Sequence, residues 1–249
     1  MKRFLFLLLV PFSVFANPID EMCPQFVLRG APVSQITSTI YLCKQNYAIN
    51  YRTDTKTAEY VVEHPTREAV TGPSKRKDDF RPDPSVPVQF QSQLADYAGH
   101  PYDRGHLVPA GDSTQTAAIM SESFFLSNMM PQNPGNNRGI WKYLEEQTRA
   151  IAQKQGDVFV ITGTVYDGAV IARIGNVEVP THIYKIIIDP RTGRTLAHLF
   201  PNIKLDVADL DRYAVTVADI EKVTGIDFSP RIPANLKVKE TQRTLLKDW

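Results

Sequence analysis

The side chains of this 249-residue chain best suited to chemistry are a histidine, an arginine and an asparagine in a fixed order. His106 closely follows Arg104, and Asn137 comes later, at the start of a predicted helix. A neutral histidine is a suitable base at pH 7, because its reference pKa is about 6.5. An arginine grips phosphate oxygens through paired hydrogen bonds, and an asparagine carbonyl is a hard oxygen ligand for magnesium. This order predicts metal-assisted hydrolysis of a phosphodiester.

Glu145 adds an acidic group about two helical turns after Asn137. At about 100° per residue the two side chains lie about 80° apart around the helix, on one flank. A glutamate there suits hydrogen bonds to the water molecules of a metal ion rather than direct ligation. Taken singly, each residue has an ordinary explanation: His106 as a structural histidine, Asn137 as a helix cap, and Glu145 as part of a solvent-exposed helix face.

The helix that would carry Glu145 has a clear apolar stripe. The stripe consists of residues at helical spacing, namely Ile140, Trp141, Leu144, Thr148 and Ile151. Asn133 or Asn136 can cap its start, and Gly156 can end it.

Several segments rich in β-branched and aromatic residues predict strands. Residues 47–51 and 58–62 form a hairpin around a polar turn, and further strands are expected at residues 158–162, 169–174, 183–188 and 195–200. A last helix is expected over Asp209–Thr224. Residues 64–101, rich in proline and charge, predict a long functional loop. Short turns between the strands favour an α+β fold with a central antiparallel β-sheet flanked by helices.

The N-terminus has the features of a secretory signal peptide over residues 1–16. Lys2 and Arg3 precede an apolar run, and Val14-Phe15-Ala16 offers a cleavage site; the alternative is a buried N-terminal helix. The run is too short to span a bilayer. The sequence therefore predicts an exported, soluble protein with no membrane attachment after cleavage, and leaves open whether it is periplasmic or secreted.

Export would affect the oxidation state of Cys23 and Cys43, the only two cysteines. An oxidising compartment favours a disulfide between them, and two free buried thiols are the alternative. Loss of the two basic residues in residues 1–16 would change the net charge from +1 to a slightly negative value. A protein that grips many phosphates is usually strongly basic, so phosphate binding is expected in a local cleft, which suits an enzyme better than a protein that coats nucleic acid.

Three blocks of sequence resemble the DNA/RNA non-specific endonucleases of the ββα-metal class, which include secreted bacterial nucleases and mitochondrial endonuclease G. The blocks are residues 102–107 (YDRGHL), 125–132 (FLSNMMPQ) and 136–145 (NNRGIWKYLE). The resemblance continues to about residue 230, and implies an endonuclease domain over residues 45–230. Residues 17–44, with the expected disulfide, and a tail at residues 231–249 lie outside it. A ββα-metal finger is expected to run from the strand before His106 to the helix near Asn137.

The resemblance also implies a role for each site residue. His106 is similar to the general base, and Asn137 to the single direct protein ligand of magnesium, with manganese as a substitute. Glu145 resembles the glutamate that orders metal-bound water, and Arg104 the group that contacts phosphate near the leaving group. Asn128 matches an active-site asparagine that either contacts substrate or supports the His106 loop.

The family also has an upstream arginine that stabilises the charged phosphorane. Arg76 is the better match and Arg81 the reserve, with a solvated basic loop as the alternative. In the family, the motif often continues after the histidine with alanines. Here the histidine is followed by residues 107–112 (LVPAGD), and we leave Asp112 outside the predicted site.

The expected function is exported, magnesium-dependent hydrolysis of DNA and RNA that leaves 5′-phosphate ends. Indifference to sequence follows if contacts go to phosphates. One alternative is a metal-dependent phosphoesterase with a small or sequence-specific substrate, and another is a secreted binding module that has lost catalysis. The sequence leaves open a preference for DNA or RNA and whether the protein forms a homodimer.

Overall fold

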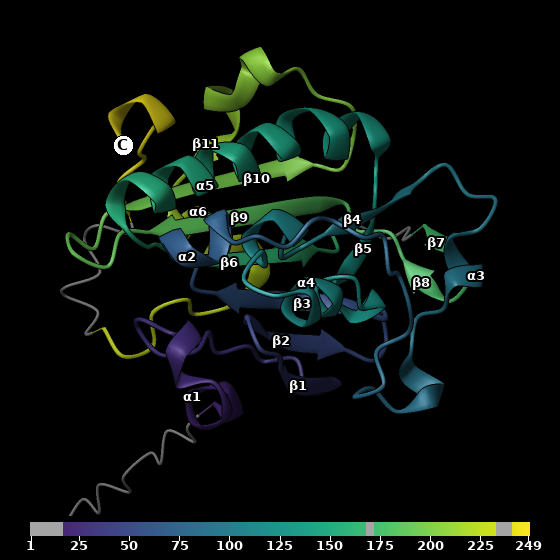
Figure 1. Ribbon diagram of the computed structural model, residues 1–249. Coiled ribbons are helices and arrows are strands. Elements are labelled where there is room, and N and C mark those ends of the chain that lie inside the picture. Colours follow the sequence, from purple (N-terminus) through teal and green to yellow (C-terminus); the bar gives the residue numbers. More distant parts are fainter. Residues whose placement is uncertain (1–16, 168–171, 233–240) are drawn as a thin grey trace, which may run out of the picture.

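The computed structural model describes residues 17–167, 172–232 and 241–249, with a seven-stranded antiparallel sheet at its centre (Figure 1). The strand order is β1-β2-β3-β6-β9-β10-β11. These strands are β1 (Thr39–Cys43), β2 (Tyr47–Arg52), β3 (Thr57–Glu63), β6 (Phe159–Val165), β9 (His182–Ile188), β10 (Thr195–Pro201) and β11 (Ala214–Val215). The sheet confirms the predicted α+β class.

Both faces of the sheet are buried, which explains why the sequence of β9 is almost continuously apolar. Ile183 and Ile187 face one hydrophobic cluster, while Tyr184, Ile186 and Ile188 face another. Successive side chains of a strand point to opposite faces, so each face receives every second residue. The first cluster lies beneath the helix of the predicted site.

Helices cover both faces of the sheet (Figure 1). The first face packs against α5 (Lys142–Gln155), which contacts α2 (Arg67–Thr71). The second face packs against α1 (Pro18–Met22) and α6 (Val217–Thr224). The long segment between β3 and α5 carries the short helices α3 (Leu94–Tyr97) and α4 (Ala117–Glu122).

A separate two-stranded sheet supports the predicted site. In it, β4 (Asp103–His106) pairs with β5 (Met129–Gln132), so that His106 lies opposite Met129. Gly105 is required here, because a Cβ would lie 2.1 Å from the Gln132 side chain. The remaining strands, β7 (Arg173–Ile174) and β8 (Val177–Glu178), form a small hairpin.

The chain after β5 turns into a helix that is kinked before α5. Asn133 caps its start, with Oδ1 accepting a hydrogen bond from the Gly135 N–H at 2.9 Å, which settles the choice between the two predicted caps. Residues Asn136–Trp141 are wound as a π-helix, and Gly139 has non-helical angles. The α5 helix then ends at Gly156, as predicted, with φ +107°.

Two predicted elements need correction. The single helix over Asp209–Thr224 is wrong: a 3₁₀ segment (Val207–Tyr213) is followed by β11, and only then by α6. Thr216 separates them, because its Oγ1 accepts from the Asp219 N–H while the Asp219 carboxylate accepts from the Thr216 N–H. Of the strand predicted at residues 169–174, only Arg173–Ile174 forms within the described residues; residues 169–171 lie outside them.

The N-terminal segment packs on the same sheet. A disulfide joins Cys23 to Cys43, as predicted, with their Cα atoms 6.0 Å apart. Ile19 and Phe26 enter the second hydrophobic cluster, and the Asn17 amide donates to the Tyr60 hydroxyl. The predicted signal peptide lies outside the described residues. Within them, no helix combines the length and the apolar character needed to cross a bilayer.

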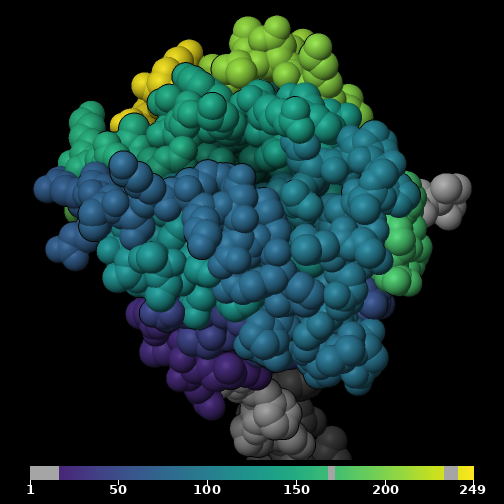
Figure 2. Space-filling view, turned by 45° about the vertical axis from the view of Figure 1, so that its right-hand side comes forward, coloured from purple at the N-terminus to yellow at the C-terminus, as the bar shows by residue number. Residues whose placement is uncertain are grey.

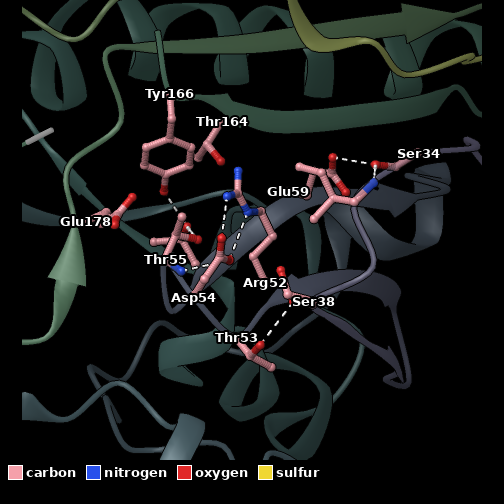
Figure 3. Close-up of polar contacts among 12 residues, drawn as sticks. Ser34, Ser38, Arg52, Thr53, Asp54, Thr55, Glu59, Thr164, Tyr166 and Glu178 are labelled. Atoms are coloured by element: carbon pink, nitrogen blue, oxygen red, sulfur yellow. Dashed lines mark hydrogen bonds and ion pairs between the residues drawn. The ribbon is translucent and has the colours of Figure 1, made fainter. Parts of the chain in front are cut away.

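Polar side chains of the β2–β3 hairpin bond to one another and to Tyr166, which follows β6 (Figure 3). The Arg52 guanidinium donates two hydrogen bonds to the Asp54 carboxylate, at 3.1 and 2.6 Å, and lies 5.2 Å over the Tyr166 ring. The Tyr166 hydroxyl in turn bonds to Thr57. We refer to Arg52, Asp54, Thr57 and Tyr166 as the hairpin cluster.

Candidate active site

A cleft of about 490 Å³ lies between the β4 region, the loop before it and α5. Figure 2 shows the surface hollowed where the blue segment meets the teal segment that contains α5. The predicted residues His106, Arg104, Arg76, Asn137 and Glu145 all line this cleft. Residues that are distant in sequence therefore meet in one place.

His106 lines the cleft but is largely buried, with 8% of the residue's surface exposed. Its ring meets the Phe124 ring edge to face, with centroids 5.0 Å apart, and Nε2 has no hydrogen-bond partner among the described residues. Burial lowers the pKa of His106 to about 3, and the positive charges of Arg76 and Arg104 act in the same direction. The imidazole is therefore neutral at pH 7, with a nitrogen free to accept a proton.

Asn128 holds the loop that follows His106. Its Oδ1 accepts from the Val108 N–H at 3.0 Å, and its Nδ2 donates to the carbonyls of Val108 and Ser123, at 2.9 and 2.8 Å. The residue is fully buried and does not line the cleft. Two roles were predicted for Asn128. Its contacts fit support of the His106 loop, and its burial does not fit contact with substrate.

The two candidate upstream arginines occupy different places. Arg76 lines the cleft, with its guanidinium 5.1 Å from the Phe124 ring centroid and Nε donating to Asp78. Arg81 instead donates through Nη1 to Asp79 and to the Ser121 carbonyl, away from the cleft lining. The structure therefore favours Arg76 over Arg81 as the second cationic group of the site.

Asn137 is oriented by a carboxylate. Its Nδ2 donates to Asp103 Oδ2 at 2.9 Å, and Asp103 also accepts two hydrogen bonds from Arg138, at 2.8 and 2.6 Å. Because a carboxylate only accepts, the amide nitrogen must face Asp103, which leaves the carbonyl oxygen for another partner. Burial raises the pKa of Asp103, but the contact with Arg138 more than offsets this effect. The pKa is therefore lowered, and the carboxylate stays charged.

The cleft suits a hard cation that keeps most of its water. Asn137 and Glu145 line it with side-chain oxygen atoms, and no group of three His, Cys, Asp or Glu residues in the described parts of the chain is placed to hold a metal ion. Magnesium binds through few protein oxygen ligands and retained water, whereas zinc is usually held by three or four histidine, cysteine or carboxylate side chains. The donor set therefore fits magnesium.

Charged residues around the predicted Glu145 were not themselves predicted as part of the site. Burial raises the pKa of Glu145 to about 7, opposed by the charges of Lys185 and Arg149. Arg149, one helical turn after Glu145, also lines the cleft and donates to Asp112 Oδ1 at 3.0 Å. Lys185 is buried and donates to Thr162 Oγ1 at 2.8 Å.

The signals for these residues were present in the sequence. Arg149 has the helical spacing that places it beside Glu145, and Lys185 interrupts a run of β-branched residues in a buried strand. Asp112 was noted only as a departure from the family word. Arg138 and Lys142, both strongly exposed, line the cleft as well.

The remaining histidines lie outside the cleft lining. His64 pairs with Asp157 at 2.9 Å and stacks on Phe159, while His198 stacks on Phe200 in the core. These contacts account for His64 and His198 structurally.

Comparisons with known proteins identify the family. The sequence model of the DNA/RNA non-specific endonuclease family matches residues 27–235. This chain belongs to that family. Nuclease C1 of Cunninghamella echinulata var. echinulata is 37% identical over 234 residues, covering 87% of this chain and 90% of that protein. Human mitochondrial endonuclease G is 33% identical over 207 residues, covering 77% and 70% respectively.

A solved structure of this endonuclease family shares the fold. A chain in the crystal structure of the EndoG/EndoGI complex superimposes with a TM-score of 0.77 at 27% identity, covering 89% of this chain and 95% of that one. The comparisons confirm the family expected from the sequence. They make the protein a nuclease, a hydrolase that acts on nucleic acids, from a family that generally depends on a divalent metal.

Proposed function

We propose that this endonuclease is exported, depends on magnesium, and hydrolyses DNA and RNA without sequence selection to leave 5′-phosphate ends. The observation that carries the proposal is the cleft itself. His106 shares it with the oriented Asn137 amide and with Arg76 and Arg104. A base, a ligand for a hard cation and two phosphate-binding cations thus surround one space.

His106 is proposed as the general base. Its neutral imidazole would take a proton from the water that attacks phosphorus, while Arg104 and Arg76 bind the non-bridging oxygens. The two arginines help to lower the His106 pKa in the free protein. A bound phosphodiester anion would offset their charge, so His106 would accept a proton more readily in the substrate complex.

Asn137 and Glu145 would hold the metal, Asn137 through its carbonyl oxygen and Glu145 through water. Bound magnesium, or manganese in its place, supplies positive charge to the phosphate and the leaving 3′-oxygen. Asp103 keeps the amide nitrogen of Asn137 turned away, so no rotation is needed to present the oxygen. Asn128 contributes by fixing the backbone that follows His106.

The lack of sequence selection is inferred from the groups that line the cleft. Arginine guanidinium groups and the Lys142 ammonium suit phosphate, which is the same at every nucleotide. Export is inferred from residues 1–16 of the sequence, and the Cys23–Cys43 disulfide is compatible with an oxidising compartment.

The test uses the purified mature protein, supercoiled plasmid and total RNA, with magnesium or with a chelator. Both substrates should be degraded with magnesium and stay intact with the chelator. A 5′-phosphate end is shown if kinase labelling of the products requires prior phosphatase treatment. Survival of most of both substrates would favour an enzyme with a small or specific substrate, and chelator-insensitive binding without cleavage would favour a binding module.

A further inference from the structure

Arg104 has an unusual environment for an arginine in this protein. Its guanidinium lies 4.3 Å from the centroid of the Phe80 ring, and no hydrogen bond or ion pair to it is found among the described residues. A guanidinium that meets a ring through its face keeps its N–H donors, which point outward in its plane, free for other partners. Phe80 therefore contacts Arg104 without occupying any donor that could bind phosphate.

Other arginines that lie over aromatic rings in the described segments bond to an acceptor as well. Arg52 over Tyr166 donates to Asp54, and Arg81 over Phe125 donates to Asp79. The same holds for Arg76, which donates to Asp78, and for Arg194, which donates to the Asp248 carbonyl. Within the described residues, Arg104 is the stacked arginine whose donors have no acceptor.

Phe80 is itself fixed in position. Its ring meets Phe124 edge to face at 5.0 Å and lies 5.7 Å from the His106 ring. It packs against two small hydrophobic clusters, one containing Tyr97 and Leu126 and the other containing Met120 and Phe124. Its place therefore depends on packing, and not on Arg104.

We propose that Phe80 is a positioning residue for catalysis, whose ring face holds the Arg104 guanidinium toward the cleft with its donors free for the scissile phosphate. The assignment rests on the proposed function, in which Arg104 binds that phosphate. An acidic residue could orient the guanidinium too, but it would occupy the donors and repel the substrate anion. An aromatic face provides orientation without either effect.

The first experiment compares Phe80→Leu with Phe80→Tyr and Phe80→Trp. The leucine variant should lose on the order of tenfold in kcat/KM on plasmid DNA, because it keeps apolar packing but lacks the ring face. At least one aromatic variant should retain most of the activity. Phe90→Leu is the matched control, since Phe90 is a partly buried residue of the same long loop that packs on the main core and does not line the cleft. It should affect thermal stability but not kcat/KM.

The second experiment is a double-mutant cycle with Arg104→Ala, measured by binding in the presence of a chelator. The probe is a short fluorescent single-stranded DNA, which is not cleaved under these conditions. Phe80→Leu and Arg104→Ala should each raise its Kd, and the double variant should match Arg104→Ala alone, because Phe80 acts through Arg104. This measurement does not need catalysis, so it separates a failure of this assignment from a failure of the proposed hydrolysis.

Three results would overturn the assignment. One is a folded Phe80→Leu variant with kcat/KM and Kd within about twofold of the wild type. Another is a loss in both aromatic variants as large as the loss in Phe80→Leu. The last is a double variant whose Kd increase is the product of the two single increases, since Phe80 would then act independently of Arg104.

Discussion

The hairpin cluster and the cleft use similar residues in opposite ways. In both, an arginine lies over an aromatic ring: Arg52 over Tyr166 and Arg104 over Phe80. In the hairpin cluster, Asp54 accepts two hydrogen bonds from its arginine, and Tyr166 bonds to Thr57 (Figure 3). In the cleft, Arg104 has no acceptor among the described residues.

The difference distinguishes structural polar groups from groups prepared for a ligand. Arg52 and Asp54 neutralise each other, and although burial opposes it, the Arg52 contact lowers the pKa of Asp54. In the cleft, burial and the nearby charges of Arg76 and Arg104 lower the pKa of His106 and keep its imidazole neutral. A neutral base beside positive charge fits a site that receives an anionic ligand.

The largest expected effect comes from removing the base. His106→Ala should lower kcat by about three orders of magnitude or more, because the attacking water loses its proton acceptor. The measurement is single-turnover cleavage of plasmid DNA, with circular dichroism to show that the variant is folded. Near-normal activity in a folded variant would rule out His106 as the base.

The two arginines provide a matched pair. Arg104→Lys should lower kcat/KM on the order of a hundredfold, because an ammonium cannot bind phosphate through two parallel donors, and should barely change stability. Arg52→Lys should do the reverse, lowering the free energy of unfolding by about 1 kcal/mol and leaving kcat/KM unchanged. Comparable effects of both substitutions on activity would contradict the contrast between the two regions.

Asn137→Ala should act on metal dependence. Loss of the amide oxygen should shift the magnesium titration of activity to higher concentration by about tenfold or more, with little change in the melting temperature. Asn133→Ala is a useful control, since Asn133 caps the same helix but does not line the cleft. An unchanged magnesium titration in Asn137→Ala would argue against ligation by this residue.

The last prediction concerns the pH dependence of stability. The pKa of His106 is about 3 when folded and about 6.5 when unfolded, so the unfolded chain binds a proton first as the pH falls. Its contribution to stability is complete above pH 6.5 and declines toward pH 3. The free energy of unfolding of the wild type should therefore fall relative to that of His106→Ala as the pH is lowered over this range. Asp54 should contribute to acid sensitivity only below about pH 4, since its folded pKa is lowered from an unfolded value near 3.8.

Elements with strong periodicity were predictable from the sequence. Strands β2, β3, β6, β9 and β10 and the helix that ends at Gly156 all lie close to their predicted places, because a continuous apolar run or a helical stripe determines them locally. The short edge strand β11 and the break before α6 depend on pairing with β10 and on the Thr216 cap. These features depend on contacts that hydrophobic periodicity does not show, and periodicity alone favoured one long helix.

The site was predictable in composition but not in its supports. The order of His106, Asn137 and Glu145 indicated one cleft before any fold was known. The choice between Arg76 and Arg81 required the path of the long loop, because both carry the same charge in the same stretch. The support role of Asn128 depends on backbone contacts to Val108, which no sequence pattern shows.

The position of the disulfide separates a group that affects stability from the groups that determine the catalytic rate. Cys23 belongs to the hydrophobic cluster on the face of the sheet opposite α5, whereas the cleft is built on the α5 side. A protein whose crosslink lies on the far side of the sheet from its chemistry can be made longer-lived in harsh surroundings without slowing its reaction. Adaptation to a hostile environment and adaptation of the rate can therefore proceed through different residues.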